Sequence, residues 1–392
     1  MTMIKYKSNL IFIAIIFSSI AAGAQSYNSF YGSIVNLCSF DSINNNLIEF
    51  ENLGIKEHGT LAQKNTLNWL INKYADYGYL DIEIDTFNYA AQDSYNLVVT
   101  KHGTIYPNSY LIVDAHYDTK NGPGTNDNGS GVSIILEIAR LLQNVDTEFS
   151  IKFINFSGEE DGLVGSSSYV NNIVVPNNMD IKLVFNIDQV GGINSTTNNK
   201  IICERDESSP TLSNASSWLY TDTLATCVSL YSNLITEISF AYSSDYIPFQ
   251  YNNEVITGLF EKNQSPYTHT PSDILSNMDV NYVYEVAKAA IGASLFFAVA
   301  FQTNVGIATK NKTVISIYPN PVKDILTINL NKLAIDHAKL CLIDAIGKTI
   351  LLKKINTQKE QLLMNNFPSG IYTLVISSPT FYIAKKIVHS VY

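Results

Sequence analysis

Acidic and imidazole side chains in this sequence follow three apolar stretches, each close to the point where the stretch ends. His116 comes shortly after the first stretch, the pair Glu159-Glu160 after the second, and Asp188 directly after the third. The first stretch is an aliphatic run, and all three are typical of buried β-strands in length and in their largely apolar composition. In open α/β sheets, ligands bind at the carboxyl ends of the strands, so we expect these side chains to converge. The three stretches are residues 110–113, 151–156 and 181–187.

Convergence of several carboxylates with an imidazole predicts a metal site, because the carboxylates repel one another unless cations lie between them. Zinc prefers imidazole, carboxylate and thiolate ligands. A hydrolytic two-metal site holds its ions roughly 3.5–4 Å apart. It needs one bridging carboxylate and about two further ligands for each ion. The sequence offers a suitable set of residues, which are His116, Asp127, Glu160, Asp188 and His269.

Two further acids stand next to these candidate ligands. Asp118 lies two residues beyond His116, where a carboxylate can accept the second N–H of a metal-bound imidazole and fix its tautomer. Zinc lowers the pKa of a bound water molecule from 15.7 to about 7. Glu159 stands beside Glu160, so it is the candidate base that takes the proton and passes it to a leaving amine.

The composition is that of a folded, acidic protein. Of 392 residues, 46% are hydrophobic and 15% are charged, which excludes a disordered chain. The formal net charge of −10 argues against nucleic acid or an anionic membrane surface as the main partner. None of the four cysteines forms a CxxC pair. Cys203 and Cys227 are equally compatible with a disulfide in an oxidising compartment and with separate buried thiols.

The first 24 residues have the pattern of a secretory signal peptide. Lys5 and Lys7 precede an apolar core, and Ala22-Gly23-Ala24 is a typical cleavage site. The apolar run is too short for a comfortable membrane span. The mature protein has no other run that requires a membrane-spanning interpretation, so we expect it to be soluble and exported.

The rest of the chain predicts two domains of different class. Residues 25–303 alternate between helical and strand patterns and predict an α/β domain. Residues 304–313 are polar and indicate a linker. Residues 314–392 predict an all-β module of sandwich type. In the first domain we expect helices over residues 59–77, 130–142, 211–230 and 280–301, and further strands over 80–87, 96–100 and 254–260.

Five short motifs carry the candidate residues. They are Ala115-His116-Tyr117-Asp118-Thr119, Asn126-Asp127-Asn128-Gly129-Ser130-Gly131, the stretch from Ser157 to Ser166, Asn186-Ile187-Asp188, and His269-Thr270-Pro271-Ser272-Asp273. Together they resemble the co-catalytic zinc aminopeptidases of the bacterial leucyl aminopeptidase type, over roughly residues 40–303.

This resemblance implies a role for each residue. His116, Asp127, Glu160, Asp188 and His269 would bind two zinc ions, with Asp127 bridging them and Glu159 as the general base. The implied fold is a phosphorylase/hydrolase-like α/β sandwich with a mixed central sheet flanked by helices.

The family often shows Ser-Asp-His before a Pro-aromatic pair, and here Tyr246 replaces that histidine. Some members steady the developing oxyanion with a tyrosine, a role for which Tyr246 and Tyr242 are both open candidates.

The C-terminal module resembles the sorting domain of the type IX secretion system. The matching pieces are Tyr318 to Ile328, Gly347-Lys348 and Phe367 to Tyr372. The alternative is a generic β-sandwich that binds carbohydrate or a partner protein, but the Tyr-Pro-Asn-Pro start and the C-terminal position favour sorting. The resemblance implies export through the periplasm to the cell surface or the medium, with the type IX machinery as a partner.

The expected function is therefore an exported zinc aminopeptidase that acts on peptides. Two alternatives compete with it: a glutaminyl cyclase of the same fold, and a binding protein on an inactive peptidase scaffold. The form of residues 126–131 argues against the cyclase, and the presence of all ligands and the base argues against the inactive scaffold. Dipeptidase and carboxypeptidase activities remain open, because the sequence does not show the pocket that reads the free terminus.

Overall fold

The computed structural model of the chain describes residues 26–302, 316–330, 335, 338–344, 348–378 and 381–390. The expected signal peptide, residues 1–24, and the expected linker, residues 304–313, lie outside the described residues. The chain divides into two compact units, Met1–Thr303 and Asn304–Tyr392.

A mixed sheet of eight strands runs through the first unit. The strands are β1 (Ile82–Tyr89), β2 (Gln92–Lys101), β3 (Tyr106–His116), β5 (Phe149–Phe156), β6 (Asp180–Ile187), β7 (Lys200–Arg205), β8 (Ile235–Phe240) and β9 (Ile256–Glu261). Their order across the sheet is β1-β2-β5-β3-β6-β9-β7-β8. The four central strands β5, β3, β6 and β9 are parallel, whereas β2 pairs with β5 and β7 pairs with β9 in antiparallel fashion. The central strands therefore end at one common edge.

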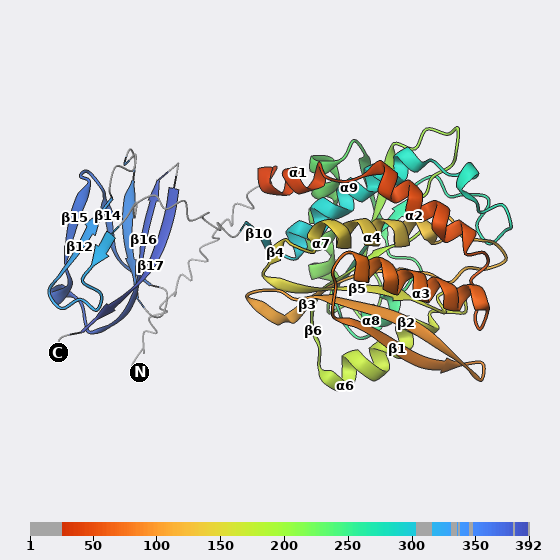
Figure 1. Cartoon of the computed structure of the whole chain (residues 1–392), viewed down its shortest axis with the longest axis horizontal. Helices are drawn as coiled ribbons and strands as arrows, with labels where there is room; N and C mark the ends of the chain where they lie inside the picture. The colour runs from red at the N-terminus through yellow and green to blue at the C-terminus, as the bar shows by residue number, and fades with distance from the viewer. Residues whose placement is uncertain are drawn as a thin grey trace, which may run out of the picture. The chain divides into compact units, whose positions relative to one another are not determined.

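Helices cover both faces of this sheet (Figure 1). Successive side chains of a strand point to opposite faces of the sheet. A strand that is covered by helices on both faces therefore carries apolar side chains on both. In β3, Leu111 and Val113 join the core beneath one helical layer, and Ile112 joins the core on the other face. The first layer contains α1 (Ser29–Val35), α2 (Phe40–Asn52), α3 (Leu61–Asp76), α4 (Gly129–Leu142), α7 (Asn214–Tyr231) and α9 (Val280–Phe297), and the second face carries α5 (Val164–Tyr169), η1 (Val170–Val174), α6 (Val175–Asn177) and α8 (Tyr246–Tyr251).

The central helix α4 begins next to the carboxyl end of β6. The Asn128 side chain caps it by accepting a hydrogen bond from the Gly131 N–H group at 2.9 Å. A Cβ atom at Gly131 would lie 2.2 Å from the backbone oxygen of Ile187. Only glycine allows this approach, which explains the second glycine of the predicted motif.

The predicted fold class, a mixed central sheet flanked by helices, is confirmed. The expected helix over residues 280–301 is too long, because α9 ends at Phe297. Val299 has a left-handed φ of +51°, and the backbone continues as β10 (Ala300–Phe301), which pairs with β4 (Asp146–Thr147). A short 3₁₀ turn, η2 (Leu275–Asn277), precedes α9. Cys203 and Cys227 are buried thiols that are not joined by a disulfide.

The described residues of the second unit form two small antiparallel sheets, as the sequence predicts. One sheet contains β11 (Ser316–Tyr318), β12 (Ile325–Asn329) and β15 (Lys359–Leu363), and the other contains β14 (Thr349–Lys354), β13 (Lys339–Ile343), β16 (Gly370–Ser378) and β17 (Phe381–His389). The turn η3 (Met364–Asn366) follows β15. Leu326, Leu340 and Leu374 belong to a single apolar core that both sheets share.

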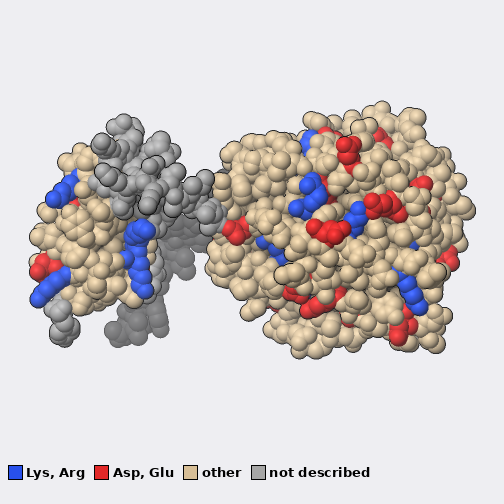
Figure 2. All heavy atoms as spheres, in the orientation of Figure 1, with Lys and Arg blue, Asp and Glu red and all other residues tan. Residues whose placement is uncertain are grey.

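Charged side chains are interspersed with a majority of uncharged ones on the face of the first unit in Figure 2. The net charge is therefore not gathered into one patch on this face. Among the described residues, every helix is too short or too polar to cross a membrane.

Candidate active site

Three neighbouring strands bring the predicted residues to one edge of the sheet. His116 is the last residue of β3, Asp188 directly follows β6, and the loop with Glu159 and Glu160 follows β5. Because β3 runs parallel to both neighbours, the ends of all three strands meet at this edge. The expected convergence is therefore present in the structure.

The first group of ligand-type atoms is centred on His116. Its Nε2 atom lies 3.3 Å from Oδ1 of Asp127 and 3.3 Å from Oδ1 of Asp188. The His116 side chain is fully buried, and those of both aspartates are largely so. All three donor atoms lie within 4.8 Å of one another, which suits a single cation.

The second group shares Asp127 with the first. The Asp127 Oδ2 atom lies 3.2 Å from Nε2 of His269, and Oε2 of Glu160 lies 2.7 Å from the same nitrogen. These three donor atoms again lie within 4.8 Å of one another. Asp127 thus presents one carboxylate oxygen to each group, as a bridging carboxylate must.

Several buried donor atoms of these groups fit zinc because the protein itself leaves them unsatisfied. Among the described residues, His116 Nε2, Glu160 Oε1 and Asp188 Oδ1 have no hydrogen-bond partner although each atom is buried. Buried polar atoms in proteins are normally hydrogen-bonded, so such atoms need an explanation. Imidazole nitrogen and carboxylate oxygen atoms both bind zinc, so the residues of the two groups supply suitable zinc ligands without any further protein group.

The raised pKa values of Glu159 and Glu160 also indicate a site for cations. Burial, with Asp188 among the nearby acids, raises the pKa of Glu159 to about 8. Burial and the neighbouring Asp127 raise the pKa of Glu160 to about 9. Burial raises both pKa values although the nearby His116 lowers them, and cations between the acids would favour the ionised forms of both carboxyls.

Asp118 has a somewhat different role from the one expected. Its backbone oxygen, not its carboxylate, is hydrogen-bonded to Nδ1 of His116 at 3.1 Å, and the carboxylate Oδ1 lies 3.8 Å from that nitrogen. The carboxylate instead accepts the backbone N–H groups of Glu159 at 3.3 Å and Glu160 at 3.2 Å. Asp118 therefore orients the imidazole through its backbone and fixes the loop that carries both glutamates.

Two supporting residues were not assigned from the sequence. Ser244 donates a hydrogen bond of 2.7 Å to Oδ2 of Asp188, and so leaves Oδ1 directed to the first group. Asp273 accepts the backbone N–H groups of Asn126 at 2.9 Å and Asp127 at 3.0 Å, which fixes the loop before α4. Both residues lie inside motifs that the sequence shows, but nothing in the sequence indicates their partners.

The two tyrosines considered for oxyanion stabilisation occupy different environments. Tyr246 is 1% exposed, and its hydroxyl donates to Oε2 of Glu204 at 2.8 Å. Tyr242 is 78% exposed and lines a cavity of about 350 Å³. Glu159 and all of the candidate ligands except His116 line the same cavity. Tyr242 therefore has the freer side chain of the two.

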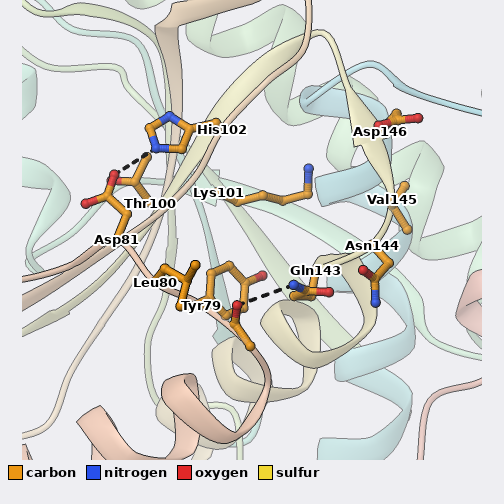
Figure 3. A pocket seen from close by; sticks show the side chains of 11 residues that line it. Tyr79, Leu80, Asp81, Thr100, Lys101, His102, Gln143, Asn144, Val145 and Asp146 are labelled. Carbon is orange, nitrogen blue, oxygen red and sulfur yellow. Dashed lines mark hydrogen bonds and ion pairs between the residues drawn. The ribbon is translucent and has the colours of Figure 1, made fainter.

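A separate cavity of about 700 Å³ lies at the opposite edge of the sheet (Figure 3). It contains the end of β2, where Lys101 pairs with Ile151 near the start of β5. Lys101 points into this cavity, and His102 forms an exposed ion pair of 2.9 Å with Asp81. None of the predicted site residues lines it.

Comparison with known proteins gives independent information on both units. Residues 96–294 match the family described as Peptidase family M28, and residues 316–390 match the Secretion system C-terminal sorting domain. The second match indicates a protein that is secreted or held at the cell surface. The aminopeptidase YwaD of Bacillus subtilis is 32% identical over 194 residues, which are 48% of this chain and 41% of that protein. This chain thus spans less than half the length of that curated relative.

Solved structures share the fold of the first unit at low identity. The LapA aminopeptidase of Legionella pneumophila has a TM-score of 0.62 at 21% identity, with 76% of this chain and 81% of that chain covered. The glutaminyl cyclase of Macrostomum lignano also has a TM-score of 0.62, at 14% identity, with 72% and 96% covered. These similarities show the fold and do not separate the two activities. The match over residues 96–294 spans half of the sequence and includes all five candidate ligands, so this chain belongs to peptidase family M28.

Proposed function

We propose that this chain is an exported aminopeptidase that uses two zinc ions to remove residues from the N-termini of peptides. One observation carries the proposal: the two oxygens of Asp127 face two separate groups of donor atoms. The relatives named as aminopeptidases and the family membership support the type of reaction.

In this proposal each ion has its own ligands in addition to Asp127. His116 and Asp188 hold one ion, and Glu160 and His269 hold the other. Bound zinc supplies Lewis-acid activation of water and of the scissile carbonyl group.

Glu159 is the proposed general base. Its Oε2 atom lies 3.8 Å from His116 Nε2, and its side chain lines the same cavity as Asp127 and Glu160 without contacting His269. A carboxylate in that position takes a proton from the attacking water and returns it to the leaving amine. The loop is held by Asp118, so the base keeps a fixed position relative to the ligands.

Export is the second part of the proposal. Residues 1–24 have the signal-peptide pattern, and residues 316–390 match a secretion sorting domain. We infer that the chain crosses the periplasm and leaves the cell through the type IX machinery. The C-terminal sorting domain would then direct export and take no part in hydrolysis.

The central experiment joins metal analysis with an activity screen on the purified mature protein. We expect close to two zinc ions per chain by mass spectrometry of the metal content, hydrolysis of aminoacyl-anilides, and loss of hydrolysis after chelation that added zinc reverses. An N-terminal glutaminyl peptide is included in the screen. Pyroglutamate formation without anilide hydrolysis would favour the cyclase, and full activity of metal-free protein would refute the zinc mechanism.

A further inference from the structure

A second cavity, of about 310 Å³, opens directly beside the candidate active site. Asp188, Tyr242 and Phe260 line both this cavity and the one that contains the ligand groups. A substrate whose reacting bond lies at the ligand groups can therefore place a neighbouring side chain into it. We call it the side pocket, and its inner wall is formed by β7, β8 and β9.

Besides Asp188, the side pocket contains a second acid, Glu204 of β7, which is not a candidate metal ligand. This residue is 5% exposed and lines the pocket. The Tyr242 N–H group donates to the Tyr246 hydroxyl oxygen at 3.0 Å, which directs the Tyr246 proton to Glu204 Oε2 at 2.8 Å. Among the described residues, Glu204 Oε1 has no hydrogen-bond partner, and no lysine or arginine forms an ion pair with Glu204. One carboxylate oxygen is thus available to a ligand.

The walls of the side pocket suit an extended, partly apolar side chain. Ile202, Phe240 and Phe260 supply apolar surface, and Ser239 and Gln264 supply polar groups. Lysine and arginine bury their aliphatic stems against such surfaces and keep the charged head among polar partners. A buried carboxylate with a free oxygen matches that head, because hydrogen bonds between ionised groups are the strong ones.

We propose that Glu204 makes this enzyme select peptides with an N-terminal lysine or arginine, by accepting a hydrogen bond from the cationic head at Oε1. The inference rests on the proposed aminopeptidase function and adds its substrate class. Tyr246 acts as a positioning residue, because its hydroxyl donates to Oε2 and leaves Oε1 for a ligand.

The electrostatics of the pocket agree with a cationic ligand. Burial raises the pKa of Glu204 to about 8, and Asp188 adds to the rise. A positive group beside the carboxyl favours its ionised form and so compensates part of this burial cost. An acidic substrate side chain would find no such compensation, because no lysine or arginine is among the residues that line the pocket.

The test compares lysine with norleucine, which has the same stem without the ammonium group. Lysyl and norleucyl p-nitroanilides are assayed with the zinc-loaded full chain and with Glu204→Gln. Because a hydrogen bond between charged groups is worth roughly tenfold or more in binding, we expect wild-type kcat/KM to favour lysine by about that factor. Glu204→Gln should reduce the lysine-to-norleucine ratio about tenfold. A ratio of two substrates on one protein does not change when part of the sample is unfolded.

The matched control is Glu237→Gln on the adjacent strand β8. Glu237 is partly exposed, pairs with Lys262 at 2.6 Å and does not line the side pocket, so its substitution should leave the ratio unchanged. A wild-type preference for norleucine, or an unchanged ratio in Glu204→Gln, overturns the inference. An equal loss with both substrates also overturns it, because that result assigns Glu204 to structure or to the α-amino group.

A binding measurement separates failure of this inference from failure of the proposed function. Calorimetry with free L-lysine and L-norleucine should show tighter binding of lysine that depends on Glu204. If the protein hydrolyses both anilides without preferring lysine, the pocket assignment is wrong and the peptidase stands. If neither anilide is hydrolysed but lysine binds more tightly through Glu204, the pocket assignment stands and the peptidase is wrong. Absence of both effects refutes both.

Discussion

The adjacent acids Glu159 and Glu160 provide the sharpest test of the proposed mechanism, because they are chemically alike but face different partners. Glu160 Oε2 lies 2.7 Å from His269 Nε2 within the second ligand group. Glu159 belongs to neither ligand group, and its Oε2 atom lies 3.8 Å from His116 Nε2. Glu159→Gln keeps the size of the side chain and removes only the base. Glu160→Ala removes a ligand.

The two variants should differ in metal content as well as in rate. General base catalysis contributes about 10²–10⁴-fold, which equals about 3–5 kcal/mol of transition-state stabilisation. We therefore expect Glu159→Gln to lose at least 10²-fold in kcat while its KM and zinc content stay close to those of the wild type. Glu160→Ala should lose zinc and rate together, because the second group keeps only two of its three donors.

The assay measures zinc per chain and steady-state hydrolysis of one anilide for each protein. Asp161→Asn is the control, because Asp161 is exposed in the same loop and belongs to neither ligand group. It should keep both zinc and rate. Loss of zinc in Glu159→Gln with retention in Glu160→Ala would reverse the two roles. If both variants remain fully active, the active site lies elsewhere.

Three further perturbations test the supporting structure. Asp273→Ala removes the acceptor of two buried backbone N–H groups beside the bridging Asp127, so urea unfolding of the zinc-free protein should show a loss of roughly 2–4 kcal/mol; a loss below 1 kcal/mol would contradict this role. Ser244→Ala removes the donor to Asp188, and competition with a chelator should show about 10–100-fold weaker zinc binding; unchanged affinity would show that this hydrogen bond does not position the ligand. Deletion of residues 314–392 should leave anilide hydrolysis intact and retain the protein in the periplasm of its native host, as cell fractionation would show; normal export would refute the sorting role.

The sequence predicted the fold class and the residues that the structure gathers at one edge. His116, Glu160 and Asp188 could be recognised because each follows a short, largely apolar stretch of the kind that forms a buried strand. Parallel strands with helical crossovers end on the same side, so polar groups at these ends meet whatever the rest of the chain does. Strands β7 and β8, which run opposite to the four central strands, were not predicted, because their short and partly polar sequences lack a clear period.

Only the tertiary structure decided how these residues are supported. The donor set of Asp188 depends on Ser244, which is 56 residues away in the sequence, and the loop of Asp127 depends on Asp273, 146 residues away. Glu204 likewise becomes a candidate specificity residue only because Tyr246 reaches it across 42 residues. Local periodicity reports which face of an element is buried, but it carries no information on which distant side chain fills the space opposite. The partner of each side chain is determined when the strands and loops pack, because a buried carboxylate is costly unless another group forms a hydrogen bond with it.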